Sequence, residues 1–324
     1  MASENETLAS VDPFKLLQIT LNPDGTLTRH INLGKTPANP EESSDNPIAV
    51  LSKDITINPS NKTWVRIFLP IPKPSTKLPV FLYFHGGGFI ISSPDDTTFH
   101  EFCSNLATEL HVIIVSASYR LGPEHRLPAA YDDAMEALYW IKTSNEIWLE
   151  NYADLSNVFV MGISAGGNVA YQLGLRAAEQ ADNLSPLKIK GLILHHPFIG
   201  GVERTESELR SDAPLFRPCV SDLMWELSLP IGVDRDHEYC NPTVGSSNSS
   251  AFEKIKRLGW RVFVAGCHGD QLIDRQIELV KIMEKAYIQV VSRFVGGSHG
   301  LELLDHSKAM ELFVALKDFV LSSI

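Results

Sequence analysis

The sequence predicts an α/β protein in which a mostly parallel sheet is covered by helices on both faces. First, apolar strand-like runs alternate with helix-like patterns from residue 78 onward, as a parallel sheet requires. Second, one of these runs, 158–161, leads through a Gly-x-Ser-x-Gly turn directly into a helical pattern. Third, residues 200–250 interrupt the alternation. A chain of 324 residues, 44% of them hydrophobic, is able to bury such a sheet in a single domain, 1–324.

The chain before residue 78 predicts short antiparallel strands. Residues 18–30 alternate around Asn22-Pro23-Asp24-Gly25, which favours a turn between two strands. Residues 53–57 and 64–69 also have the pattern of strands, and we expect them to pair antiparallel at the edge of the sheet. A proline-rich linker, 70–74, separates them from the alternating region.

The alternating region provides the predicted core. We expect strands at residues 79–84, 112–118, 158–161, 189–196, 261–266 and 288–294. We expect helices at residues 97–110, 129–142, 275–286 and 308–320. The interruption at 200–250 contains an amphipathic segment bounded by Pro218 and Pro230. A long insertion at the carboxyl edge of a parallel sheet favours a lid over a ligand crevice, although a merely structural excursion is the alternative.

The composition disfavours several classes of protein. The net charge of −11 disfavours binding to nucleic acid or to an anionic membrane. No window approaches the roughly 18 apolar residues of a membrane span, and the acidic, polar first residues do not resemble a signal peptide. The four cysteines, Cys103, Cys219, Cys240 and Cys267, are far apart in the sequence. Such spacing is typical of reduced thiols, so we expect this protein in the cytoplasm. Both a monomer and a dimer remain open.

The turn at Gly162-Ile163-Ser164-Ala165-Gly166 has the features of a nucleophile elbow. Small residues must flank the serine because the turn is sharp, and the helix N-terminus behind it favours developing negative charge. Alone the pattern is weak, since a structural Gly/Ser turn looks the same. Other motifs in the chain are needed to distinguish a nucleophile elbow from a structural turn.

A second glycine-rich loop, His85-Gly86-Gly87-Gly88-Phe89, follows the predicted strand 79–84. Bare backbone N–H groups after a buried strand can approach a ligand closely and stabilise an oxyanion. The alternative is a flexible turn. The position of the loop, before the serine-bearing half of the sheet, favours the oxyanion role.

A reactive serine needs a base, and the base needs an acid to orient it. Asp270 and His299 each follow a predicted strand, so both are expected at the same sheet edge as Ser164. We therefore predict a catalytic triad of these three residues. Asp274 is a weaker candidate because it falls in the next predicted helix, and His268 is too close to Asp270 to be oriented by it.

Other polar residues are ambiguous. We interpret the segment 119–133 as an ionic scaffold, with catalysis by Asp132 or Asp133 as the weaker reading. For His195-His196, packing is as plausible as substrate contact. The chain has no Walker spacing, Gly-x-Gly-x-x-Gly or His-Glu-x-x-His, so we expect no organic cofactor and no metal.

In these motifs the chain resembles the hormone-sensitive-lipase-like branch of α/β-hydrolases, and closely its plant carboxylesterases. The shared motifs are His85-Gly86-Gly87-Gly88, Tyr119-Arg120-Leu121-Gly122-Pro123-Glu124-His125, Gly162-x-Ser164-Ala165-Gly166-Gly167, Asp270-x-Leu272-x-Asp274 and Ser298-His299-Gly300. The resemblance implies an α/β-hydrolase fold with eight strands in a mostly parallel sheet, a cap from residues 1–50 and 200–250, and oxyanion donors at Gly87, Gly88 and Ala165. Two positions depart from it: Ile163 replaces a usual acidic residue, and Gly122 replaces a usual alanine.

The expected function is that of a serine carboxylesterase acting through an acyl-enzyme on small to medium, partly apolar esters, including plant secondary metabolites. Candidate pocket residues are Phe89, Ile90, Ile163, His195, Phe216, Met224 and Trp225. One alternative is a small-molecule receptor of the same fold, against which the intact His299 counts. Another is a non-hydrolytic lyase or cyclase in specialised metabolism, such as that of alkaloids, which the sequence does not exclude.

Overall fold

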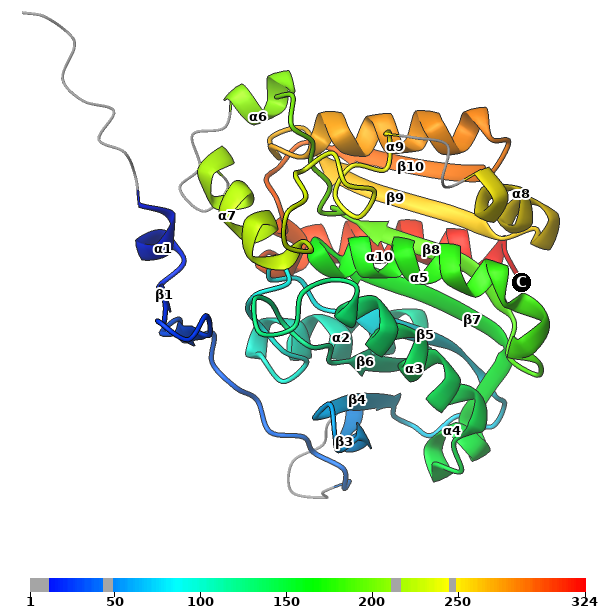
Figure 1. Ribbon diagram of the computed structural model, residues 1–324. Helices are drawn as coiled ribbons and strands as arrows, with labels where there is room; N and C mark the ends of the chain where they lie inside the picture. The colour runs from blue at the N-terminus through cyan, green and yellow to red at the C-terminus, as the bar shows by residue number, and fades with distance from the viewer. Residues whose placement is uncertain (1–11, 43–48, 211–216, 245–248) are drawn as a thin grey trace, which may run out of the picture.

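The computed structural model describes residues 12–42, 49–210, 217–244 and 249–324, and its centre is a twisted sheet (Figure 1). The strands are β3 (Val50–Asn58), β4 (Thr63–Pro70), β5 (Leu78–Phe84), β6 (Ile113–Ala117), β7 (Ala153–Ile163), β8 (Ile189–His195), β9 (Arg261–Cys267) and β10 (Gln289–Val295). They form an 8-stranded sheet in the order β10-β9-β8-β7-β5-β6-β4-β3. Only the pairings β3–β4 and β4–β6 in this sheet are antiparallel. The predicted mostly parallel sheet with an antiparallel edge is therefore confirmed.

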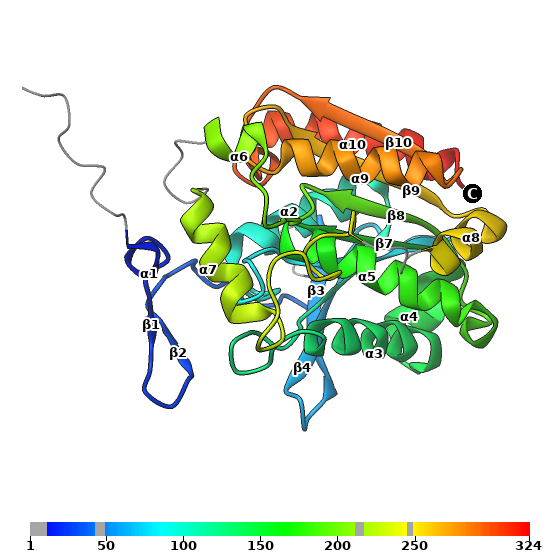
Figure 2. The same cartoon turned by 45° about the horizontal axis from the view of Figure 1, so that its top comes forward.

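Helices cover both faces of the sheet, as Figures 1 and 2 show. One face carries α3 (Ala129–Thr143), α4 (Ile147–Tyr152), α5 (Ala165–Glu179), α8 (Ser249–Leu258) and α9 (Ile273–Lys285). The other face carries α2 (Thr97–Leu110) and α10 (His306–Leu321). Short 3₁₀ helices, η1 (Ala181–Leu184) and η3 (Leu301–Leu303), lie in the connections. In the described part of the chain, no helix is both long and apolar enough to cross a membrane.

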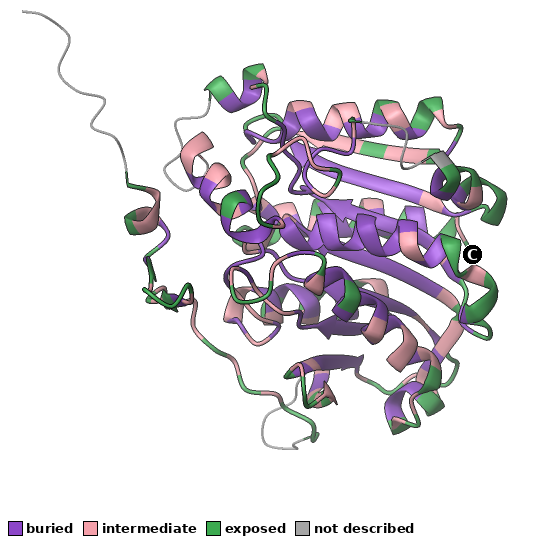
Figure 3. Cartoon of the chain, viewed as in Figure 1, coloured by how far each residue is buried: buried purple, intermediate pink, exposed green. Residues whose placement is uncertain are grey.

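The inner strands, β4 to β9, are mostly buried on both sides, which explains why they appear in the sequence as apolar runs, whereas the edge strands β3 and β10 are only partly buried (Figure 3). Along β5, Val80 and Leu82 pack with α3 and α5, whereas Phe81 and Tyr83 pack with α2 and α10. Successive side chains of a strand point to opposite faces, so each strand contributes to both cores. The sheet is consequently a rigid base that holds its strand-end loops in fixed positions.

A third, smaller core lies over the carboxyl ends of the strands. It joins the N-terminal segment, made of α1 (Pro13–Leu16), β1 (Ile19–Leu21) and β2 (Leu27–Arg29), to α7 (Pro218–Ser228), which follows α6 (Glu206–Arg210) in the insertion. Leu17 packs here with Leu223 of α7 and with Ile90 of the glycine loop. Both views place these elements together at one end of the sheet (Figures 1 and 2). The predicted N-terminal hairpin and the amphipathic segment of the insertion thus meet over the same edge.

Candidate active site

Ser164 is held in the strained turn between β7 and α5. Its backbone angles, φ 55° and ψ −120°, lie in a region that residues other than glycine rarely occupy. A Cβ on Gly162 would lie 2.0 Å from the carbonyl oxygen of Gly166, and one on Gly166 would lie 2.1 Å from that of Phe84. Both flanking positions therefore require glycine, for the steric reason that the sequence pattern suggested.

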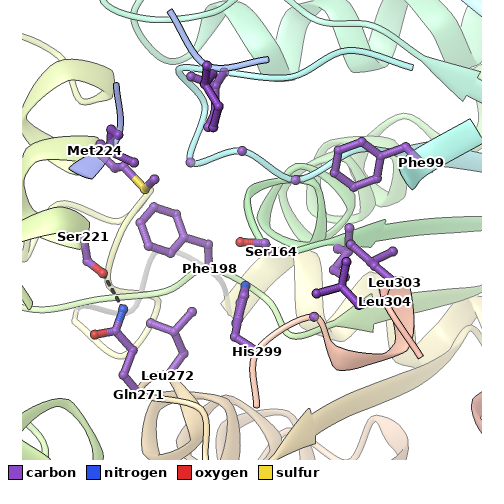
Figure 4. A pocket seen from close by; sticks show the side chains of 18 residues that line it. Phe99, Ser164, Phe198, Ser221, Met224, Gln271, Leu272, His299, Leu303 and Leu304 are labelled. Atoms are coloured by element: carbon purple, nitrogen blue, oxygen red, sulfur yellow. Dashed lines mark hydrogen bonds between the residues drawn. The ribbon is translucent and has the colours of Figure 1, made fainter. Parts of the chain in front are cut away.

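Asp270 and His299 meet just beyond the ends of β9 and β10. Nδ1 of His299 lies 2.7 Å from Oδ2 of Asp270. Because an ionised carboxylate only accepts hydrogen bonds, Nδ1 carries the proton and Nε2 is left as the basic nitrogen. Figure 4 shows the ring of His299 directed toward the hydroxyl of Ser164. The structure therefore brings the three predicted triad residues together.

The carboxylate of Asp270 is buried and strongly hydrogen-bonded. Its Oδ1 accepts from the backbone N–H of Leu272 at 3.0 Å, and its Oδ2 also accepts from Gln276 at 3.2 Å. Burial by itself would raise the pKa of Asp270, but the charge of His299 and the hydrogen bonds from His196 and His299 hold this pKa well below its usual range. Asp270 is therefore an ionised acceptor at neutral pH.

The glycine loop after β5 has positive φ at three consecutive residues, Gly87, Gly88 and Phe89. Gly87 has φ +107° and Gly88 has φ +59°, and a Cβ on Gly87 would lie 2.2 Å from the carbonyl oxygen of Ile91. Tyr119 supports the loop from below: its hydroxyl donates to the carbonyl of His85 at 2.8 Å, and the two rings stack with centroids 4.3 Å apart. The loop is thus a fixed backbone surface rather than a flexible turn.

Three backbone N–H groups near Ser164 are open to a ligand. Among the described residues, the N–H groups of Gly87, Gly88 and Ala165 take no part in the backbone hydrogen bonds of loops, turns and helix caps. Ala165 is the first residue of α5, whose positive end adds to the attraction for an anion. The arrangement has the donors that a tetrahedral oxyanion needs.

A largely apolar cavity of about 300 Å³ surrounds Ser164. It is lined by Leu17, Ile31, Gly86, Gly87, Gly88, Ile91, Phe99, Ile163, Ser164, Phe198, Ser221, Met224, Gln271, Leu272, His299, Gly300, Leu303 and Leu304. Figure 4 shows Phe99, Leu303 and Leu304 on one side of Ser164, with Phe198 and Met224 on the other. Such a cavity has room for an apolar group on each side of a carbonyl held at Ser164.

Of the predicted pocket residues, Ile163 and Met224 line this cavity. The apolar Ile163, in place of an acidic residue, keeps the wall beside the nucleophile free of charge. Phe216 lies outside the described residues. The prediction for the remaining four requires correction, because their side chains are packed elsewhere.

Phe89, Ile90, His195 and Trp225 do not line the cavity. Phe89 and Trp225 are 1% exposed and pack against each other, with ring centroids 5.5 Å apart. Ile90 belongs to the small core beneath α7. His195 is fully buried beside Phe102, and burial lowers its pKa to about 4, so it is neutral. These four side chains support the site without facing it.

Several lining residues were not identified from the sequence. Leu17 and Ile31 come from the N-terminal segment, Phe99 from the first turn of α2, and Leu303 from η3. For Leu17 and Ile31 the implied cap over residues 1–50 was a usable signal. Phe99 and Leu303 gave none, because an apolar residue at a helix end has the same pattern whether it faces a core or a cavity.

The segment 119–133 is a scaffold, as the sequence suggested. Asp133 is buried and binds Arg120 with two oxygens, the shortest contact being 2.7 Å. Asp132 binds Arg176 of α5 at 2.7 Å. Neither carboxylate lines the cavity. The segment instead ties α3 to the loop beneath the glycines.

Two groups of side chains in the described residues have the closeness of metal ligands. They are His195, His196 and Glu302, and His196, Asp270 and His299. Hydrogen bonds account for their proximity: His196 lies 3.0 Å from both Asp270 and Glu302. These side chains could ligate a metal ion, but the hydrogen bonds between the histidines and the carboxylates explain the arrangement equally well.

Comparison with known proteins places the chain in a family. A family profile described as "alpha/beta hydrolase fold" matches residues 81–303, which is more than half of the chain. The chain belongs to the α/β-hydrolase family. The matched region spans the glycine loop, the elbow, Asp270 and His299.

Relatives that match nearly the whole chain are named as plant carboxylesterases. The chain is 52% identical to carboxylesterase 20 of Arabidopsis thaliana, with 96% of this chain and 97% of the relative covered. It is 44% identical to 3-O-acetylpapaveroxine carboxylesterase CXE1 of Papaver somniferum, with 96% and 98% covered. The expected membership of the hormone-sensitive-lipase-like plant carboxylesterases is confirmed, and this α/β-hydrolase is a carboxylic ester hydrolase.

Solved structures agree on the fold. An esterase of Pyrobaculum calidifontis superposes with a TM-score of 0.72 at 22% identity, covering 86% of this chain and 87% of that one. A fungal esterase of Rhizomucor miehei gives 0.73 at 19% identity, covering 85% and 84%. At this distance the likeness shows the α/β-hydrolase fold alone.

Proposed function

We propose that this α/β-hydrolase cleaves carboxylic esters through an acyl-enzyme, with Ser164 as nucleophile, His299 as general base and Asp270 as the residue that orients the base. The observation that carries the proposal is the pairing of Asp270 with His299 at 2.7 Å beside the strained Ser164, in one apolar cavity. A receptor needs no such strained serine. A lyase or cyclase would need no serine elbow either.

The first proposed step is acylation of Ser164. Nε2 of His299 takes the proton of the Ser164 hydroxyl as its Oγ forms a bond to the ester carbonyl carbon. The carbonyl oxygen becomes an oxyanion and accepts hydrogen bonds from Gly87, Gly88 and Ala165, each worth roughly 3–4 kcal/mol to the barrier. The bond to the alkoxy oxygen then breaks, and the imidazolium returns its proton to the departing alcohol.

Deacylation repeats these steps with water. His299 takes a proton from a water molecule whose oxygen attacks the acyl carbon, and the same three N–H groups hold the second oxyanion. The bond to Ser164 Oγ breaks, the carboxylic acid leaves, and the serine regains its proton. Asp270 stays ionised and stabilises the imidazolium in both halves of the reaction.

The cavity favours small to medium esters with apolar groups. Its volume of about 300 Å³ and its apolar lining suit such ligands. A relative at 44% identity is named as a carboxylesterase of 3-O-acetylpapaveroxine, which supports acyl esters of plant secondary metabolites as the substrate class. No cofactor or metal takes part in the proposed steps.

We assign the cap to the N-terminal segment and the insertion, over a single hydrolase domain. Leu17 and Met224, which line the cavity, come from these two parts of the chain. A cytoplasmic location is supported by the thiols, which form no disulfide within the described residues.

Labelling and substitution at Ser164 test the function. A fluorophosphonate should label Ser164, and Ser164→Ala should lower kcat on p-nitrophenyl acetate by about 10⁴-fold or more while the fold is kept. Ser221→Ala is the matched control, because Ser221 lines the same cavity on α7. Full activity of Ser164→Ala, or labelling of another residue, overturns the proposal.

A further inference from the structure

His196 occupies a strained, fully buried position next to the triad. It directly follows β8, has φ 45°, and its side chain is 0% exposed. The N–H of Ser164 donates to the carbonyl of His195 at 2.9 Å, so this pair of histidines also borders the nucleophile turn. A positive φ at a residue with a large side chain persists only where surrounding contacts fix it. For His196, these contacts include the hydrogen bonds of its two ring nitrogens.

Both ring nitrogens of His196 face carboxylates. Nδ1 lies 3.0 Å from Oδ2 of Asp270, and Nε2 lies 3.0 Å from Oε2 of Glu302. A neutral imidazole has one N–H, whereas an ionised carboxylate only accepts. Both contacts are hydrogen bonds to carboxylates only if the ring carries a proton on each nitrogen.

The surroundings of His196 bear on its charge. Within the described residues, the titratable groups that face it are His195 of β8, Cys267 of β9, Asp270 before α9, His299 after β10 and Glu302 of η3. Burial by itself lowers the pKa of His196, but hydrogen bonds with Asp270, Cys267 and Glu302 outweigh it and raise this pKa well above the usual range. Glu302 is also ionised, since hydrogen bonds with His195 and His196 outweigh its burial and lower its pKa.

We propose that His196 is a positioning residue: a permanent imidazolium, held between Asp270 and Glu302, that fixes the carboxylate of Asp270 for His299. Oδ2 of Asp270 accepts from both His299 and His196, so the second histidine limits the rotation of the carboxylate. The inference rests on the proposed role of Asp270 and His299 in ester hydrolysis.

Glu302 balances the positive charge of His196. Asp270 and Glu302 ionised with a cationic His196 leave a net charge of −1 beside His299, the same as one ordinary triad carboxylate. The His196 and His299 ring centroids are 5.0 Å apart, close enough for the cation to oppose protonation of the base. Without the cation, two carboxylates would favour protonation of His299, so the base would already be lost at a higher pH than in the wild type.

Three variants separate charge from packing. His196→Gln leaves two carboxylates without a cation, so the acid limb of the kcat/KM profile should move to higher pH by about one unit. Glu302→Gln leaves Asp270 with a neutral His196, which keeps the net charge at −1 as in the wild type, and the limb should stay near its wild-type position. The double variant His196→Gln/Glu302→Gln has the same charge and should recover most of the shift.

His195→Gln is the matched control. His195 is buried next to His196 and lies 3.3 Å from Glu302, whereas the side-chain partners of Asp270 are His196, His299 and Gln276. This variant should lower thermal stability without moving the acid limb. An unshifted limb in His196→Gln, or an additive shift in the double variant, overturns the inference.

A measurement on the wild-type protein keeps the inference testable if His196→Gln fails to fold. Of the 11 histidines, one should stay doubly protonated at pH 8 in ¹⁵N-histidine NMR spectra, and that signal should vanish in Glu302→Gln. The absence of any imidazolium at pH 8 overturns the inference. This measurement needs no turnover, so it is independent of the Ser164 experiments that test ester hydrolysis.

Discussion

Met224 of α7 packs directly against the bare backbone of Gly88: a Cβ built on Gly88 would lie 2.3 Å from the Met224 sulfur. The insertion therefore contacts the proposed oxyanion loop at Gly88, within the cavity that surrounds Ser164. Met224 is a flexible side chain, so it contributes an adaptable part of the cavity wall beside Gly88.

Met224→Ala should change substrate selectivity. The lost side chain opens space beside Gly88, so the preference among esters of increasing chain length should change by about 1–3 kcal/mol. Turnover of the smallest ester should remain nearly unchanged because the triad is untouched. Measuring kcat/KM on a series of p-nitrophenyl esters checks this, and equal losses on every ester contradict it.

Trp225 is the neighbouring control on the same helix. Its ring is buried and stacks on Phe198 with centroids 4.5 Å apart, away from the cavity. Trp225→Ala should lower the free energy of unfolding by about 3–5 kcal/mol. A change in ester preference from Trp225→Ala as large as that from Met224→Ala would show that α7 acts as a unit.

Asp270→Asn should lower kcat by about 10⁴-fold, because an amide NH₂ in place of the accepting oxygen turns His299 into the wrong tautomer. Asp274→Asn is the matched control: its Oδ2 accepts from the backbone N–H of Ser207 at 2.8 Å and does not face the triad. Its effect on kcat should be less than about 10-fold. Steady-state kinetics of the two purified variants decide, and a reversed order would reassign the acid.

Gly166→Ala should prevent folding, since the new Cβ would be 2.1 Å from a backbone oxygen of β5 that cannot move. Gly174→Ala, on the same helix, is the milder control because its Cβ would meet the flexible end of Leu192 at 2.4 Å. Thermal unfolding of the two variants measures the difference. A Gly166→Ala protein with wild-type stability would show that the elbow relaxes.

An ion pair connects the N-terminal segment to the hydrolase core and makes the stability of this connection depend on pH. Glu124 binds Arg29 at 2.7 Å and the N–H of Leu27 at 2.9 Å. Burial by itself raises the pKa of Glu124, but these hydrogen bonds outweigh it and lower this pKa below its ordinary value of 4.5. A carboxylate with a lowered pKa stabilises the fold above its ordinary pKa, and that contribution is lost as the pH falls further.

The N-terminal segment should therefore loosen first when the pH drops below about 4.5. Hydrogen exchange of residues 12–31 at pH 4 and pH 7 checks this against the core strands. Glu124→Gln should show the faster exchange already at pH 7, together with a raised KM, because Leu17 and Ile31 line the cavity. Equal exchange in the variant and the wild type would mean that apolar packing alone holds the segment.

The sequence by itself determined the strands of the sheet, the helices α2, α3, α5, α9 and α10, and the positions of Ser164, Asp270 and His299 at strand ends, whereas α4 and α8 were not predicted. These features are local, because a few neighbouring residues are enough to encode each of them. They are the apolar runs of the strands, the helical period, and the elbow with its two required glycines. The 2.0 Å approach at Gly162 is the physical content of the Gly-x-Ser-x-Gly pattern. For the same reason the antiparallel edge and the N-terminal hairpin were predictable.

Only the tertiary structure decided which side chains face the cavity and which support it. Phe89 and Gly88 are adjacent in sequence, yet Phe89 turns inward onto Trp225 while Gly88 lines the cavity. His196 reaches Glu302 across 106 positions of the chain. A local pattern records that a residue is apolar or titratable, but its partner depends on how distant elements pack. The contacts among the histidines and carboxylates behind His299 exist only once β8, β9 and η3 have come together.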